Sequence, residues 1–197
     1  MNRATETLPS DYFAGIYASD TDPWQFTTST YERDKYAATL ACLPRPRYRA
    51  AFEPACAIGV FTRALSERCD RLLASDLIPA AVEAARARNA DQPTVEIRQG
   101  AVPANWPEGL FDLIVLSEFL YFLDAPDLAE LVRRVGGAIE PGGDLVLVHW
   151  IGETDYPQSG DQAAESFIAQ AASFAGLLHQ DRTDKYRLDV LRAGASG

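Results

Sequence analysis

The chain has 197 residues, which is enough for one α/β domain with a full hydrophobic core. Its formal net charge of −10 argues against binding to nucleic acid, because a phosphate backbone attracts a basic surface. Three cysteines and two histidines make neither a disulfide framework nor a zinc set, so we expect no metal site and a reducing, cytoplasmic setting.

The N-terminal segment, residues 1–47, is expected to form a helical cap. Residues 1–13 lack the apolar centre of a signal peptide, and no later apolar run is long enough to span a bilayer. We therefore expect no membrane partner. The pattern predicts a short helix, a loop around Trp24, and a longer helix that Ser29 or Thr30 caps. Pro44 then stops this second helix.

From residue 48 onward, strand and helix patterns alternate, which is typical of a doubly wound, mostly parallel sheet. Apolar runs such as LIVL and LVLV fit strands that are covered on both faces. Two residues separate the last two strands, which predicts an antiparallel C-terminal hairpin. Gly142 and Gly143 are expected to end a helix and lead into the fifth strand. The seven expected strands are 50–53, 71–75, 94–99, 112–117, 145–150, 177–183 and 186–192, and the expected helices are 60–69, 79–89, 126–139 and 162–175.

The stretch Ala50–Thr62 is typical of a site for a nucleoside cofactor. A short apolar strand ends near Glu53, a loop of small residues follows, and the next strand ends in Asp76. Small residues let the backbone approach a ligand that Cβ atoms would block. A carboxylate at the tip of the second strand can accept hydrogen bonds from both hydroxyls of a ribose.

These residues resemble the first motif of the class I S-adenosylmethionine-dependent methyltransferases. That motif runs acid-x-Gly-x-Gly-x-Gly, and the chain has Glu53-x-Ala55-x-Ala57-x-Gly59. Asp76, FDLIVLSE and EPGGDLVLV match further landmarks, so the resemblance covers roughly residues 48–192. Within the class, the chain is similar to the nodulation protein S group in its segments DPW, YERDKY, EPACAIGVFT and SEFLYFL.

The resemblance implies a single methyltransferase domain over residues 1–197, with a helical cap or lid (1–47) and a Rossmann-like core (48–192). It also implies S-adenosyl-L-methionine as the cofactor and S-adenosyl-L-homocysteine as the product. Many class I enzymes have an acid after the third strand. This chain has none there, so backbone and apolar contacts are expected to hold adenine. The residues expected to bind the cofactor are Glu53, Ala55, Cys56, Ala57, Gly59, Thr62, Asp76, Leu77, Ala101, Val102, Ser117, Trp24 and Arg33.

Glu118, Tyr121 and His149 follow the fourth and fifth strands, where ligands lie in open α/β sheets, and they are the candidates for the chemistry. Each could accept the proton that an amine must lose before it attacks a methyl group, and Glu118 could instead hold a substrate ammonium. Trp24 is either a core residue of the cap or part of a lid whose aromatic face attracts a sulfonium. Cys56 is expected to pack in the loop rather than to act as a nucleophile.

The function expected from the resemblance is methyl transfer to a small molecule, first of all to the amino group of an amino sugar or glycoconjugate. The alternatives are O-methylation of a small hydroxylated or carboxylated metabolite, and a catalytically silent protein that binds the cofactor. An NAD-dependent dehydrogenase is disfavoured, because the loop lacks G-x-G-x-x-G spacing. No pattern in the sequence predicts an oligomeric state.

Overall fold

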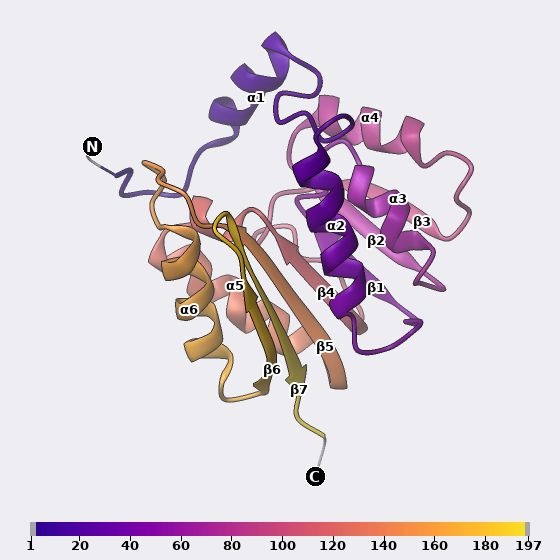
Figure 1. The fold of residues 1–197 in the computed structure, drawn as a ribbon, viewed down its shortest axis with the longest axis vertical. Coiled ribbons are helices and arrows are strands. Elements are labelled where there is room, and N and C mark those ends of the chain that lie inside the picture. Colours follow the sequence, from indigo (N-terminus) through magenta and orange to yellow (C-terminus); the bar gives the residue numbers. More distant parts are fainter. Residues whose placement is uncertain (1–2, 196–197) are drawn as a thin grey trace.

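Seven strands form one sheet in the order β3-β2-β1-β4-β5-β7-β6, in a computed structural model that describes residues 3–195 (Figure 1). Strands β1 to β5 are parallel, and β7 pairs antiparallel with both β5 and β6. The predicted doubly wound sheet with an antiparallel ending is therefore confirmed. The strands are β1 Ala51–Pro54, β2 Leu72–Asp76, β3 Val95–Gln99, β4 Phe111–Ser117, β5 Ile139–Trp150, β6 Ala175–Arg182 and β7 Tyr186–Ala193.

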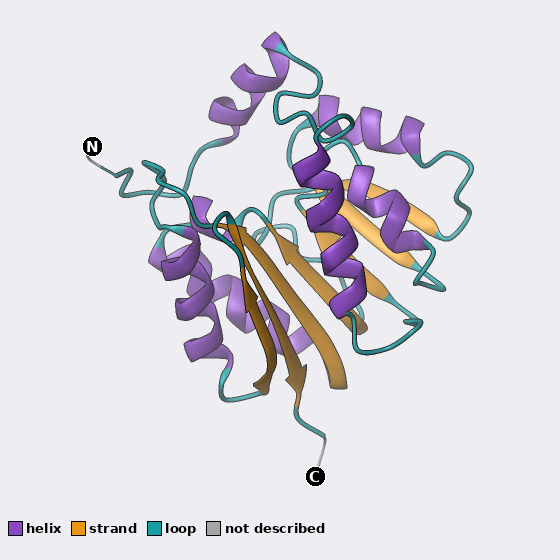
Figure 2. Cartoon of the chain, viewed as in Figure 1, coloured by secondary structure: helices purple, strands orange, loops and turns teal. Residues whose placement is uncertain are grey.

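Helices cover both faces of the sheet (Figure 2). Helices α5 and α6 pack on one face, whereas α2, α3 and α4 pack on the other. A layer of helices on each side is what continuous apolar strands require, because both faces of such strands must be shielded from water. The helices are α1 Ser10–Ser19, α2 Thr30–Cys42, α3 Val60–Ser66, α4 Pro79–Arg88, α5 Ala125–Ala138 and α6 Gly160–Ala171, with a short 3-10 helix η1 at Leu120–Phe122.

The N-terminal segment contains the two predicted helices and an ordered loop between them. The Ser29 side chain accepts a hydrogen bond from the backbone N–H of Glu32 at 3.3 Å, so the predicted cap of α2 is confirmed. In the loop, the Asp22 carboxylate accepts hydrogen bonds from the backbone N–H groups of Phe26 at 2.7 Å and Thr27 at 2.9 Å. These bonds close the loop that carries Trp24.

The fifth strand begins earlier than the sequence predicts. Ile139 already pairs with Phe111, and the ladder then shifts so that Asp144 lies opposite Leu113. Between these pairs, Gly142 has a φ of 73°, a conformation that favours glycine. The glycines therefore form an irregularity inside β5, and the prediction that they end the preceding helix is wrong. The reason lies in the tertiary structure. Ile139 is buried in the core, and its pairing with Phe111 begins β5 directly after α5.

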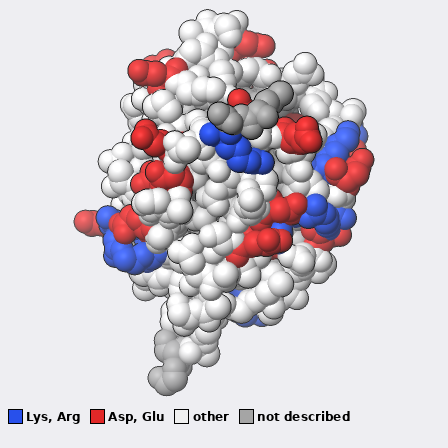
Figure 3. All heavy atoms as spheres, turned by 90° about the vertical axis from the view of Figure 1, so that its left-hand side faces the viewer, with Lys and Arg blue, Asp and Glu red and all other residues white. Residues whose placement is uncertain are grey.

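Charged side chains of both signs are interspersed over the face of the molecule seen in Figure 3. Arg182 and Arg187 both lie within ion-pair distance of Asp161 on α6. Within residues 3–195, no helix combines the length and the apolar character needed to cross a membrane.

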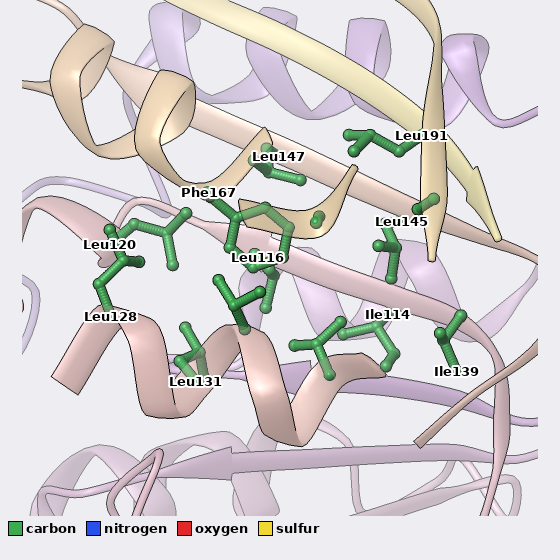
Figure 4. Packing of buried hydrophobic residues seen from close by; sticks show 14 of the residues in the cluster. Ile114, Leu116, Leu120, Leu128, Leu131, Ile139, Leu145, Leu147, Phe167 and Leu191 are labelled. Carbon is green, nitrogen blue, oxygen red and sulfur yellow. The ribbon is translucent and has the colours of Figure 1, made fainter. Parts of the chain in front are cut away.

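The core consists of two layers that meet at the central strands. Ile114 and Leu116 of β4 pack against α5 and α6, next to Leu131 and Phe167 (Figure 4). Their neighbours in sequence, Leu113 and Val115, belong to the layer under α2 and α3. All four β4 side chains are fully buried. The parallel pairing of β1, β2, β4 and β5 brings their carboxyl ends to one edge of the sheet.

Candidate functional site

A cavity of about 780 Å³ lies where the carboxyl ends of the parallel strands meet the N-terminal segment. Small-molecule sites typically have volumes of roughly 300–1,000 Å³. Most of the predicted site residues line it: Trp24, Ala55, Ala57, Asp76, Leu77, Ala101, Val102, Ser117, Glu118 and Tyr121. The remaining six predicted residues lie behind the lining or on the surface: Arg33, Glu53, Cys56, Gly59, Thr62 and His149.

The loop after β1 has an alternating left-handed backbone. Ala55, Ala57 and Gly59 have φ angles of 56°, 49° and 73°. These are the three positions at which the class I motif has glycine, so the alanines keep a backbone that glycine adopts more easily. At Gly59, a Cβ atom would lie 2.7 Å from Asn89 Nδ2, and glycine is required there. Ala55 and Ala57 tolerate a methyl group because they border the cavity.

Asp76 ties the loop to the end of β2. Its Oδ2 accepts a hydrogen bond from Ala57 N and its Oδ1 accepts one from Ile78 N, each at 2.9 Å. The side chain is 9 % exposed, and burial raises its pKa above the ordinary value even though these N–H groups favour the charged form. Each oxygen has a second lone pair, so the carboxylate can still accept hydrogen bonds from a diol in the cavity.

Glu53 lies under the loop and does not line the cavity. Burial, assisted by the charge of Asp76, raises the pKa of Glu53 to about 8. Its Oε2 has no hydrogen-bond partner within residues 3–195, and the hydroxyl of buried Thr62 has none either. Cys56 is also buried, and burial raises the pKa of its thiol, which fits the predicted packing role rather than a nucleophile.

Glu118 has a φ of 60° immediately after β4 and is the most heavily bonded acid of the cavity. Its Oε1 is paired with Lys35 Nζ. Its Oε2 accepts hydrogen bonds from Tyr121 Oη at 2.8 Å and from Trp150 N at 2.7 Å. Burial opposes ionisation, but the positive charge of Lys35 and these donors hold the pKa of Glu118 below its ordinary value.

Tyr121 and His149, the other two candidates for proton transfer, have different surroundings. Burial and the adjacent Glu118 charge raise the pKa of Tyr121, so its hydroxyl remains a neutral donor. His149 is fully buried and lies outside the cavity lining that the described residues form. Its Nε2 accepts a hydrogen bond from Leu120 N at 3.4 Å, and burial lowers its pKa to about 4. His149 thus packs edge-on against Tyr121, with ring centroids 5.6 Å apart, but lies behind the cavity lining rather than in it.

Helix α2 brings residues to the cavity that the sequence analysis did not assign there. Arg33, predicted to bind the cofactor, points into solvent and pairs with Asp34 at 2.8 Å. Tyr31, Glu32 and Lys35 line the cavity instead. A signal was present, because the buried positions 32, 35 and 39 of α2 are spaced as one helical face. Polar side chains on the face that packs inward indicate a site.

Aromatic rings from distant segments form much of the cavity wall. Tyr17 and Trp24 come from the N-terminal segment, with ring centroids 5.6 Å apart. Tyr121 from η1 stacks on Tyr156 from the loop after β5, with ring centroids 5.5 Å apart. Among residues 3–195, no group of histidine, cysteine and acidic side chains is placed to hold a metal ion.

Comparison with known proteins identifies the relatives of this chain. The family model of nodulation protein S (NodS) matches residues 17–148. Nodulation protein S from Rhizobium tropici is 36% identical over 130 residues, which is 64% of this chain and 54% of that protein. The protein of the same name from Bradyrhizobium diazoefficiens is 32% identical over 128 residues, with 64% and 61% covered. The chain thus spans little more than half the length of these curated relatives.

Solved structures show the same fold. N-methyltransferase NodS from Bradyrhizobium japonicum WM9, in complex with S-adenosyl-L-homocysteine, superposes with a TM-score of 0.79 at 23% identity, covering 93% of this chain and 97% of that one. A methyltransferase candidate from Pseudomonas syringae has a TM-score of 0.73 at 42% identity, with 83% and 99% covered. The family model matches well over half of the chain, and the chain therefore belongs to the nodulation protein S family.

Proposed function

We propose that the chain binds S-adenosyl-L-methionine in this cavity and transfers its methyl group to the amino group of a small molecule, with amino sugars and glycoconjugates as the acceptor class. The observation that carries the proposal is the left-handed backbone at Ala55, Ala57 and Gly59 beside the buried Asp76. Membership of the nodulation protein S family supports it, as does the N-methyltransferase NodS of Bradyrhizobium japonicum, whose structure holds S-adenosyl-L-homocysteine.

The lining residues fit this cofactor. Asp76 has lone pairs left for the ribose hydroxyls, and the small residues of the loop let the backbone approach the ligand. Val102 offers an apolar wall to adenine, and Ala101 lies beside it with its backbone N–H bonded to Asn105 Oδ1 at 3.1 Å. Leu77 and Ser117 also line the cavity, while Glu53, Cys56, Gly59 and Thr62 lie behind it and support the loop by packing.

The bound cofactor supplies a methyl group that its positive sulfur has already activated. The protein has to exclude water and align the acceptor. The aromatic wall that includes Trp24 supports the first task, because closure over the reacting groups keeps water out. Glu118, held in its ionised form, supports the second, because a carboxylate can orient the nitrogen of an incoming ammonium.

The composition supports a small acceptor and a cytoplasmic setting. The acidic net charge disfavours a nucleic-acid substrate, and the three cysteines are free. A mixed-charge face such as that in Figure 3 gives no continuous basic surface for phosphates among the residues in view.

Calorimetric titration with S-adenosyl-L-homocysteine tests the cofactor assignment. We expect Asp76→Ala to weaken binding by about 100-fold or more, because hydrogen bonds to a charged group contribute about 1.5–3 kcal/mol each. Asp70→Ala removes an exposed acid next to the other end of β2 and should leave the affinity unchanged. Full-strength binding by the Asp76 variant would exclude Asp76 from the site.

Mass spectrometry tests the acceptor class. Wild-type protein with S-adenosyl-L-methionine should add one methyl group to glucosamine or to a deacetylated chitooligosaccharide, and none to N-acetylglucosamine. Methylation of the acetylated sugar at the same rate would indicate transfer to oxygen. Tight cofactor binding without turnover over a wide panel of amines and alcohols would indicate a catalytically silent binding protein.

A further inference from the structure

Glu32 is a buried acid of the cavity to which the sequence analysis gave no role. It lies in the first turn of α2 and is 7 % exposed. Lys35 Nζ donates a hydrogen bond to its Oε1 at 3.1 Å. The same ammonium is ion-paired with Oε2 at 3.0 Å, although Oε2 is buried and accepts no hydrogen bond of good geometry within residues 3–195. Oε2 thus keeps a lone pair that a proton can occupy.

The two acids that share Lys35 differ in their bonding. Glu118 accepts hydrogen bonds from Lys35, Tyr121 and Trp150, whereas Glu32 is held by Lys35 and by the neighbouring Tyr36 hydroxyl. Because of this difference, the pKa values of the two acids shift in opposite directions. Burial raises the pKa of Glu32 above its ordinary value in spite of Lys35, whereas the pKa of Glu118 is lowered. The other titratable groups near Glu32 are Tyr31 and Tyr36 on α2, and Glu118 and Tyr121 after β4.

Other unsatisfied polar atoms border the same cavity. Tyr31 Oη and Thr154 Oγ1 are buried and lack hydrogen-bond partners among residues 3–195. Tyr31 also packs edge-on against Trp150, with ring centroids 5.8 Å apart. Buried polar atoms without partners are unfavourable unless a ligand completes their bonds. A polar acceptor that carries hydroxyl groups beside its amine would do so.

Resting on the methyl transfer proposed above, we propose that Glu32 takes the proton from the acceptor's ammonium group, that Glu118 stays ionised, and that Lys35 positions both acids. In this step an N–H bond of the ammonium breaks and its electron pair remains on nitrogen. The proton forms an O–H bond with Glu32 Oε2. The products are a neutral amine, which has the lone pair that methyl transfer needs, and a neutral carboxyl group, which returns its proton to water after the product leaves.

The geometry favours Glu32 over the three candidates from the sequence. Oε2 of Glu118 accepts two hydrogen bonds and Oε1 is paired with Lys35, which leaves room to orient an ammonium but makes Glu118 the weaker base, and the Tyr121 hydroxyl donates to Glu118. His149 lies outside the cavity lining. A positioned general base typically contributes about 100-fold to 10,000-fold to a rate. Loss of Glu32 should therefore be visible in turnover rather than in binding.

The test compares Glu32→Gln with wild type, using glucosamine as the amine probe. We expect kcat at pH 6 to fall by about 100-fold, because roughly 1 % of an amine with a pKa near 8 is neutral at that pH, with the KM for glucosamine changed by less than about threefold. Because the variant must take its amine already neutral from solution, its kcat/KM should rise about tenfold per pH unit up to the pKa of the amine. Wild type should reach its plateau at lower pH.

Matched variants separate this role from a structural one. Asp34→Asn removes an exposed acid of the same helix and should leave rate and pH profile unchanged. Glu118→Gln should instead raise the KM for glucosamine. The affinity of Glu32→Gln for S-adenosyl-L-homocysteine, measured by calorimetry, should equal that of wild type. If Glu32→Gln melts far below wild type, Glu32→Asp provides the second variant, with a partial rate and the wild-type pH profile.

The outcomes distinguish the two proposals. A Glu32→Gln protein with wild-type turnover and pH profile overturns the role of Glu32 and leaves the methyltransferase proposal intact. A Glu32→Gln variant that also fails to bind S-adenosyl-L-homocysteine indicates that Glu32 has a structural role. This result likewise overturns the proposed role of Glu32. Wild-type protein that methylates no amine overturns the proposed function, and the role of Glu32 with it.

Discussion

At the residue scale, residues with a strained backbone conformation are concentrated around the cavity. Four non-glycine residues of the described chain have a positive φ, and Ala55, Ala57 and Glu118 among them line the cavity. Such conformations cost about 1–3 kcal/mol each and persist only where the surrounding structure imposes them. Here the imposing contacts include the bond from Ala57 N to Asp76. The strained conformations place the small side chains of Ala55 and Ala57 and the carboxylate of Glu118 at the cavity wall.

Replacement of Ala57 by glycine tests this strain. We expect Ala57→Gly to stabilise the ligand-free protein by up to about 1 kcal/mol. Glycine removes the conformational strain of a left-handed alanine, and this gain exceeds the entropy cost of ordering a more flexible residue on folding. The control is Ala129→Gly, at an exposed position inside α5, which should destabilise by about 1 kcal/mol. Urea unfolding measures both. Equal destabilisation by the two variants would contradict the left-handed loop.

At the element scale, α2 connects the N-terminal segment to the sheet. Lys35 projects from this helix and pairs with Glu32 on α2 and Glu118 after β4. Its side chain is 3% exposed, so this network is shielded from water and from salt. The pairing raises the pKa of Lys35 despite burial, which keeps the ammonium charged. One buried cation thus joins two elements and arranges both acids of the proposed acceptor site.

Removal of this cation should loosen α2. We expect Lys35→Met to destabilise the protein by about 3–5 kcal/mol, because two buried carboxylates lose their counter-charge. Arg33→Met, on the same helix, breaks only an exposed pair and should cost less than about 1 kcal/mol. Urea unfolding gives the free energies, and limited proteolysis of the N-terminal segment reports detachment of α2. A Lys35 variant as stable as the Arg33 variant would refute the network.

At the scale of the whole molecule, the cavity joins parts of the chain that are far apart in sequence. Its lining includes Phe13 from α1, Asp76 from β2 and Tyr156 from the loop after β5. A ligand that binds there contacts the N-terminal segment and the sheet together. Binding to the folded state alone stabilises it by mass action. Ligand binding and global stability are therefore coupled in this molecule.

Thermal melting measures this coupling. S-adenosyl-L-homocysteine at 100 times its Kd should stabilise the protein by about 2.7 kcal/mol, which raises the Tm by roughly 5–11 °C for a chain of this size. The same concentration of NAD should leave the Tm unchanged, because the loop lacks dinucleotide spacing. A larger shift with NAD would favour the dehydrogenase alternative.

Much of the fold was predictable from the sequence because its signals are local. The apolar run of β4 is buried on both faces, and the alternation of strands and helices predicts the parallel sheet. Asp76 was found because it ends a strand, and strand ends converge at one edge of such a sheet. The start of β5 at Ile139 was missed, since its pairing with Phe111 depends on a distant strand.

The sequence by itself determined the order of elements, the family and the loop that faces the cavity, because these follow from nearest neighbours and short motifs. Only the tertiary structure decided which polar side chains meet. It brings Glu32 and Lys35 to Glu118, while Arg33 points into solvent and His149 lies outside the cavity lining. The physical reason is that a helix places neighbouring residues on different faces, and the packing of α2 against the sheet selects the face that lines the cavity.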